Sequence, residues 1–169
     1  MPKASPEVLE LDRFLPYRLA VLTGAISAAI ATHYADRYGL SIPQWRTLAV
    51  LARRPGLTAA EVTARGAMDK VAVSRAVAGL VTRGLLQRRS VARDRRSSSL
   101  ALTARGWTVY GEIAPWAQGY ERSLLTALSA TERRTLDVAL DKLLGATAAA
   151  ATPEAPRRAT ARASRRSPA

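Results

Sequence analysis

Arginine side chains are concentrated in one short stretch of the sequence, Arg93-Asp94-Arg95-Arg96. Charges packed this closely would repel one another unless they meet an anion or each other. Asp94 is placed to brace an arginine, and a braced guanidinium loses less entropy when it enters a narrow minor groove. We therefore interpret Arg96 as a residue that enters a DNA groove, with Arg93 and Arg95 on phosphates. The alternative is a solvated, charged turn.

A second group of hydrogen-bond donors falls on a helix that the sequence predicts from about Asp69 to Arg83. Residues at steps of three and four form its packing stripe, which is Val73, Val77, Leu80 and Val81. Another face carries Lys70, Ala72, Ser74, Arg75 and Ala78. A helix that enters the major groove needs a slim face with a few donors for phosphates and guanine edges. We predict DNA contacts from Lys70, Ala72, Ser74 and Arg75; the alternative is an ordinary amphipathic helix with one wet face.

The positive charge of the chain lies mainly in one window of the sequence. The net charge is +13, and residues 65–105 hold ten Lys or Arg and two acidic residues, for +8. Residues 153–169 add five arginines and one glutamate, for +4. A cluster of one sign attracts polyanions, so nucleic acid is the favoured partner. An anionic membrane surface is the competing partner, but the window holds no basic amphipathic helix.

Several other classes of protein are not indicated. The chain has no cysteine and one histidine, His33, which makes a dedicated zinc site unexpected and fits a reducing cytoplasm. Neither paired carboxylates, nor a nucleophile with a histidine base, nor a phosphate-binding glycine loop occurs at usable spacing. No signal peptide or membrane-spanning apolar run is recognised. We expect a soluble cytoplasmic protein that is not an enzyme and holds no cofactor or metal.

The order of the short elements predicts a winged helix-turn-helix. Capping boxes at residues 41–44 (SIPQ) and 58–61 (TAAE) open helices to about residues 52 and 65, and Asp69 can cap a third helix. Gly66 and Gly84 follow the second and third of these helices. Residues 85–89 and 98–102 are predicted strands, joined by a basic loop over 90–97. Two strands after a helix-turn-helix make a wing.

Longer helices flank this region. Residues 11–38 form one predicted helix that ends at Gly39, and Thr103 and a third capping box at 129–132 (SATE) begin two more. We expect a kink at Pro115 and an end near residue 144. The leucine stripes of the first and last helices have too few partners within one chain, so we expect a homodimer. The predicted interface residues are Leu11, Leu15, Leu19, Leu22, Leu136, Leu140 and Leu143.

These elements define a fold class and five segments. We expect a mainly α protein with a small β wing, in which a winged helix-turn-helix domain is flanked by long N- and C-terminal dimerisation helices. The segments are a flexible N-terminus over 1–10, a dimerisation helix over 11–40, the DNA-binding region over 41–103, C-terminal dimerisation helices over 104–147 and a disordered basic tail over 148–169.

The same order of elements resembles the MarR family of regulators. The wing motif appears as Asp94-Arg95-Arg96 followed by residues 102–106 (LTARG). The recognition-helix motif appears as residues 69–75 (DKVAVSR), closed by residues 83–85 (RGL). The resemblance covers about residues 11–147, and its wing motif is more specific than the helix-turn-helix alone.

The resemblance implies a homodimer on a pseudo-palindromic operator, with repression commonly relieved by a small ligand. It places the ligand between the dimerisation helices and the DNA-binding region, where the candidates are Arg18, Tyr34, Trp45, Arg46 and Trp116. Aromatic rings with an arginine suit a planar carboxylate. Residues 15–18 (LPYR), 34–41 (YADRYGLS) and 43–46 (PQWR) resemble a branch that responds to aromatic acids or their coenzyme A thioesters. The alternative is core packing for Trp45, Trp107 and Trp116, and a polar surface position for His33.

The sequence thus favours a transcription regulator that binds double-stranded DNA as a homodimer, represses, and is released by a small aromatic or anionic effector. The alternative is a basic architectural or RNA-binding protein that acts mainly through its arginine-rich tail.

Overall fold

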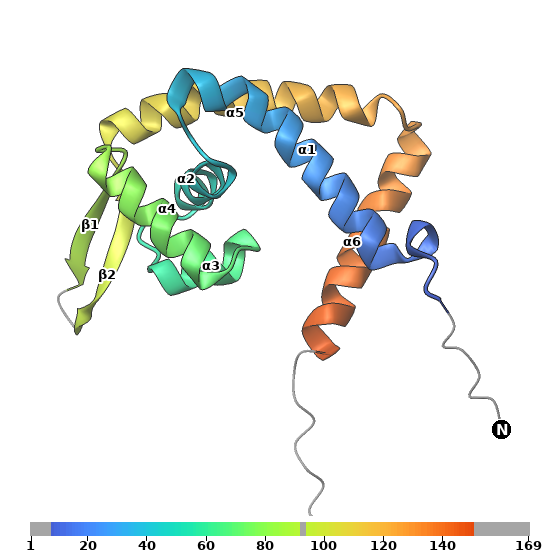
Figure 1. Cartoon of the computed structure of the whole chain (residues 1–169), viewed down its shortest axis with the longest axis horizontal. Helices are drawn as coiled ribbons and strands as arrows, with labels where there is room; N and C mark the ends of the chain where they lie inside the picture. The colour runs from blue at the N-terminus through green and yellow to red at the C-terminus, as the bar shows by residue number, and fades with distance from the viewer. Residues whose placement is uncertain (1–7, 92–93, 151–169) are drawn as a thin grey trace, which may run out of the picture. The chain divides into compact units, whose positions relative to one another are not determined.

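The computed structural model describes residues 8–91 and 94–150, with side chains placed for residues 8–89 and 98–148. The chain divides into two compact units, Met1–Arg122 and Ser123–Ala169. A short 3-10 helix, η1 (Leu11–Arg13), precedes the regular elements (Figure 1). These are α1 (Leu15–Tyr38), α2 (Ile42–Arg53), α3 (Ala59–Gly66), α4 (Lys70–Thr82), β1 (Leu86–Val91), β2 (Asp94–Leu102), α5 (Ala104–Leu125) and α6 (Ala130–Ala150). The predicted fold class, mainly α with a small β wing, is confirmed.

The helix starts follow from local hydrogen-bond chemistry. In each predicted capping box, the hydroxyl of the first residue accepts a hydrogen bond from the backbone amide of the fourth residue at 3.3–3.4 Å. The side chain of the fourth residue accepts a hydrogen bond from the backbone amide of the first residue at 2.8–2.9 Å. These reciprocal bonds satisfy amides that would otherwise lack a partner. Bonds from Thr58 and Ser129 lower the pKa of Glu61 and Glu132, so these boxes weaken only at acidic pH. The boxes are Ser41–Gln44, Thr58–Glu61 and Ser129–Glu132.

Several helix boundaries differ from the prediction. The first helix begins at Leu15 rather than at residue 11, because Pro16 has no amide hydrogen for a continuous helix and is accommodated in the first turn. Ala67, not Gly66, adopts the left-handed conformation after α3, with φ of 48°. The helix α6 runs past Gly145 to Ala150 instead of ending near residue 144. The helix α5 extends on both sides of Pro115, where the kink stays a prediction.

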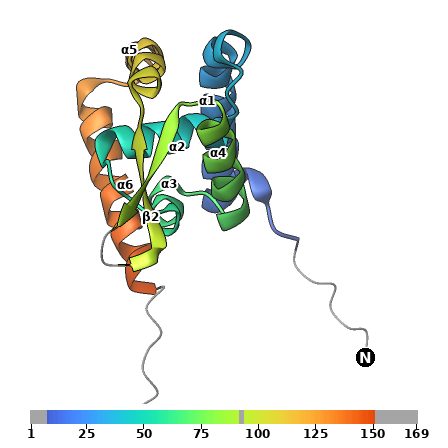
Figure 2. The same ribbon diagram turned by 90° about the vertical axis from the view of Figure 1, so that its left-hand side faces the viewer.

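The wing is a two-stranded antiparallel hairpin whose strands are longer than predicted. Leu86 pairs with Leu102, and the pairing continues to Val91 and Asp94, with an irregularity after Ser90. The expected loop over 90–97 was therefore too long. The base of the wing is tied to the α2–α3 turn, because the Gly56 amide donates to the Leu100 carbonyl at 2.9 Å. The wing thus lies beside the three short helices (Figures 1 and 2).

One core holds the short helices, the base of the wing and the adjoining parts of α1 and α5 together. Its buried side chains come from each of these elements and have almost no exposed surface: Tyr34, Leu48, Leu51, Val62, Val73, Val77, Leu80, Leu85, Leu86, Leu100 and Ile113. Burial of large apolar side chains supplies the main stabilising free energy. The orientation of α4 is fixed by its contribution to this core.

The predicted interface leucines near the two ends of the chain are exposed. All seven leucines of the two predicted interface stripes are 37–52% exposed. Among the described residues, α1 is also the one helix long and apolar enough to span a membrane, with a window of mean hydropathy 1.3. This corrects the expectation that no such stretch exists. A helix that packs against a second chain can have the same length and composition.

Candidate nucleic-acid interface

The helix α4 is anchored at its start and along one side. The Asp69 carboxylate accepts from the Ala72 amide at 2.8 Å, which confirms the predicted N-cap. Val73, Val77 and Leu80 are at most 1% exposed. Val81 packs against the same core, so the predicted packing stripe is confirmed. With this side buried, the opposite side of α4 must face outward.

The outward side of α4 carries most of the predicted contact residues. Lys70, Ser74, Arg75 and Ala78 are exposed, whereas Ala72 is half-buried and lies at the border of this side. Val71 also belongs to this side and was not predicted, because the predicted face was built on residues four apart from Lys70. The side chain of Val71, the residue that follows Lys70, is 58% exposed. The signal that could have found it is its position opposite the packing stripe.

A groove of about 350 Å³ separates the exposed sides of α3 and α4. Lys70 and Ser74 line it from α4, and Ala59, Ala60 and Thr63 line it from α3. Small side chains at the start of α3 leave room for a backbone or base edge to approach the two donors. The α3 residues were not predicted, although the two alanines inside the capping box were visible in the sequence.

The wing carries further cations. Arg88 and Arg89 are exposed on β1, and the Arg88 guanidinium donates to the Ser98 hydroxyl at 3.4 Å. Arg93 lies outside the described residues. Asp94, Arg95 and Arg96 belong to β2 by their backbone, but their side chains lie outside the described part of the structure. Their assignment to phosphates and a groove stays a prediction.

Arg83 connects the end of α4 to the end of α1. Its guanidinium donates to the Gly39 carbonyl at 2.9 Å and also to the Tyr38 carbonyl. The Tyr38 hydroxyl in turn donates to the Glu112 carboxylate of α5, which Arg37 also contacts at 3.1 Å. The bond to Glu112 raises the pKa of Tyr38. The backbone carbonyls of Tyr38 and Gly39, at the end of α1, therefore receive hydrogen bonds from Arg83, which follows α4.

Arg83→Met removes these donors and keeps most of the apolar stem. We expect the free energy of unfolding to fall by about 1.5–3 kcal/mol, because the carbonyls at the end of α1 lose charged partners. Arg105→Met is the matched control, since Arg105 is exposed and makes a single 3.3 Å bond to the Arg83 carbonyl. Urea unfolding of both variants is the measurement. Equal losses in the two would contradict a specific role for Arg83.

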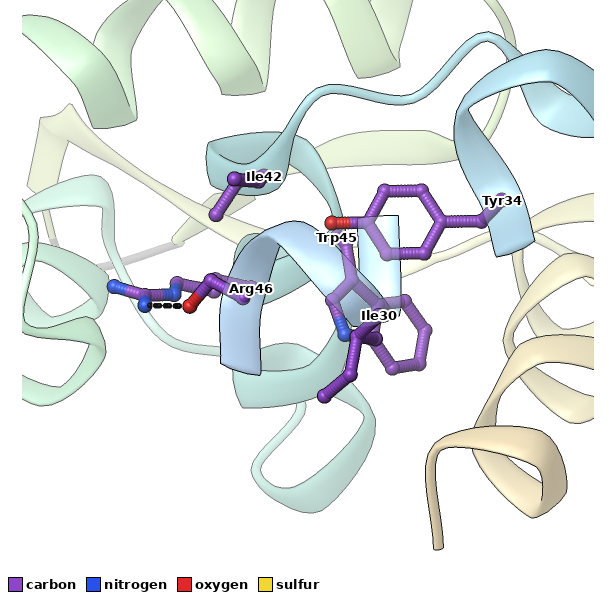
Figure 3. A pocket seen from close by; sticks show the side chains of 6 residues that line it. Ile30, Tyr34, Ile42, Trp45 and Arg46 are labelled. Carbon is purple, nitrogen blue, oxygen red and sulfur yellow. Dashed lines mark hydrogen bonds between the residues drawn. The ribbon is translucent and has the colours of Figure 1, made fainter. Parts of the chain in front are cut away.

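Three of the five predicted ligand residues meet at a small pocket. Tyr34, Trp45 and Arg46 line a cavity of about 80 Å³ with Ser27, Ile30 and Ile42. Figure 3 shows the Tyr34 and Trp45 rings close together, with centroids 5.8 Å apart, and Arg46 turned away from them. Arg46 donates to the Ser27 hydroxyl at 2.8 Å. Burial raises the pKa of Tyr34, and the nearby Arg46 charge opposes this effect.

The other two predicted ligand residues lie elsewhere. Trp116 stacks on His33 with ring centroids 4.2 Å apart, so His33 is half-buried and not the surface residue we expected. Arg18 is exposed on α1, sixteen residues before Tyr34, which is about 24 Å along a helix. Trp107 is 45% exposed, which contradicts the alternative of core packing for this residue. Within one chain, the five predicted ligand residues therefore do not line a single pocket, and their role in ligand binding stays a prediction.

No metal site is formed by the described residues, among which no three His, Asp or Glu side chains come together. The pocket at Tyr34 is also smaller than the roughly 300 Å³ or more of a typical small-molecule site. An aromatic acid would therefore fit there only after lining side chains moved.

Comparison with known proteins agrees with this geometry. Residues 38–97 match the MarR family model. The HTH-type transcriptional repressor Rv2887 of Mycobacterium tuberculosis is 28% identical over 131 residues, which cover 77% of this chain and 91% of the repressor. A MarR-family transcriptional regulator from Silicibacter pomeroyi superposes with a TM-score of 0.70 at 26% identity, covering 82% of this chain and 94% of that one. PcaV of Streptomyces coelicolor, whose crystal structure holds its natural ligand, has a TM-score of 0.70 at 22% identity, with 84% and 99% covered.

Proposed function

We propose that the chain is a winged helix-turn-helix transcription regulator of the MarR family, and that it acts as a homodimeric repressor that binds a pseudo-palindromic operator. The relatives are transcription regulators rather than enzymes. The observation that carries the proposal is the outward side of α4. It exposes Lys70, Ser74 and Arg75 in a window of charge +8, and the acidic residue just before α4, Asp69, is engaged as the N-cap.

The proposed dimer uses the exposed leucine stripes of α1 and α6. The leucines of both stripes are about 40% exposed, so an apolar partner that covered them would be stabilising. A second copy of the chain supplies an identical stripe. Two-fold symmetry would present two α4 helices about 34 Å apart, which is one turn of DNA. The wing arginines would then enter the flanking minor grooves.

We propose that a small ligand acting in the cytoplasm releases the operator, and that Tyr34, Trp45 and Arg46 are the first residues to test. These side chains combine two rings with a guanidinium, which suits a planar anion. PcaV, at 22% identity, holds its natural ligand in the same fold, which supports the proposal that this fold can bind a ligand. A rise in melting temperature with aromatic acids or their thioesters, lost in Arg46→Met, would support this site.

Arg96→Ala tests the proposed contact between the wing and DNA. We expect operator affinity to fall by at least about 1 kcal/mol, or about five-fold in Kd, with an unchanged melting temperature. Arg122→Ala is the control, because it removes the same charge from an exposed position on α5. Fluorescence anisotropy with a duplex selected by the wild type is the measurement. Equal affinities of wild type and Arg96→Ala would reject the wing assignment.

A basic architectural or RNA-binding role is the second candidate, favoured by the five arginines of residues 153–169. Such a role requires that a chain ending at residue 152 lose binding. In the proposed repressor the same truncation only weakens affinity and lowers the salt dependence, because tail arginines add phosphate contacts without sequence information.

A further inference from the structure

Viewed along the axis of α4, Val71 lies at the centre of the outward side of the helix. The buried residues Val73, Val77 and Leu80 define the inward side. With about 3.6 residues per turn, Val71 lies opposite them, in line with Arg75 and Ala78 at steps of four and three. Its side chain is 58% exposed, so it contributes little to the core.

Exposure alone would not assign a role, because single exposed apolar residues are common. The position of Val71 is more informative. It is the second residue of α4, at the end of a recognition helix that contacts base edges. Lys70 on one side and Arg75 on the other would hold this end against an anionic surface, and the charge of the window complements duplex DNA. A water-exposed valine would then be buried between the helix and the bases.

The chemistry of the major groove offers one apolar feature. Purines and cytosine present donors and acceptors there, whereas thymine also presents its 5-methyl group. An isopropyl group has neither donor nor acceptor, so it would leave other base edges without a partner. We infer that Val71 reads a thymine 5-methyl group in each operator half-site and is a specificity-determining residue; this rests on the proposed DNA-binding function.

The test removes one methyl group at a time from the DNA. A duplex is selected from a randomised pool by the full chain, and each thymine is then replaced by deoxyuridine, which keeps base pairing and loses only the 5-methyl group. We expect one position per half-site at which the wild type loses about four-fold in Kd, and about fifteen-fold when both half-sites are substituted. Val71→Ala should bind the thymine duplex as the wild type binds the deoxyuridine duplex, and should show no further loss.

Val138→Ala is the matched control, because Val138 is 54% exposed on α6, in the other compact unit. It should keep the full deoxyuridine loss. Melting temperatures should agree among all three proteins, since neither valine is buried. The inference is overturned if no thymine position in the wild type costs more than two-fold, or if Val71→Ala keeps the same loss. A wild type that selects no duplex sequence at all would instead reject the proposed function itself.

Discussion

Gly106→Ala should lower the free energy of unfolding by about 3 kcal/mol, whereas Gly111→Ala should leave it unchanged or raise it. A Cβ at Gly106 would lie 2.1 Å from the Leu85 carbonyl oxygen, so backbone has to move. Overpacking against backbone in a filled core costs on the order of 1–3 kcal/mol. Both glycines lie inside α5, and only Gly106 is buried.

The Leu85 carbonyl has little freedom to yield. It accepts from the Thr103 amide at 3.1 Å. The Thr103 hydroxyl donates to the Gly84 carbonyl at 2.7 Å and accepts from the Gly106 amide at 3.0 Å. These bonds join the start of α5 to the residues that lead into the wing. A displaced Leu85 would therefore also shift the wing, and we expect weaker DNA binding in the folded fraction of Gly106→Ala.

Gly111 provides the control within the same helix. A Cβ there meets no atom within 4 Å, and alanine favours a helix interior over glycine by roughly 0.5–1 kcal/mol. Urea unfolding followed by tryptophan fluorescence measures both variants. Equal stability of the two variants would show that the close approach at Gly106 is not what holds α5 to the wing.

Leu19→Asp combined with Leu140→Asp should convert the protein to a monomer and weaken operator binding by at least about 100-fold. A charge in an apolar helix seam is not solvated, which opposes association. Each half-site would then bind separately, without the gain of about 10²–10⁴ that linked sites provide. Light scattering gives the mass, and anisotropy with the selected duplex gives the affinity.

Val138→Asp is the control for this pair of substitutions. Val138 lies on the side of α6 opposite Leu136, Leu140 and Leu143, by the helical repeat, and is 54% exposed. It should remain dimeric with unchanged affinity. A wild type that scatters light as a monomer at micromolar concentration would contradict the dimer, whatever the variants do.

Local chemistry explains what the sequence could predict. The three capping boxes each need only four neighbouring residues, and all three form as expected. The packing stripe of α4 also follows from spacing alone, because buried residues repeat at steps of three and four. These two features were enough to predict the order of elements and the fold class.

Contacts distant in sequence could not be predicted in this way. Arg83 bonds to the Gly39 carbonyl across 44 residues, and His33 stacks on Trp116 of another helix. Neither pairing leaves a local pattern. The position of Trp116 relative to Tyr34 likewise depends on how α5 packs against α1, whereas the separation of Arg18 from Tyr34 follows from their spacing along one helix. Val71 was missed for a different reason. The buried face was predicted correctly, but the contact residues were chosen by their spacing from Lys70 and not by their position opposite that face.

Selection of duplexes from a randomised pool tests the central claim most directly. It is run with the full chain and with the chain ending at residue 152, at a stated salt concentration. We predict that both select one motif, with two inverted half-sites whose centres lie about 10 base pairs apart. Selection of no motif by either chain, or binding that disappears when residues 153–169 are removed, would contradict the assignment of α4 as the helix that reads DNA.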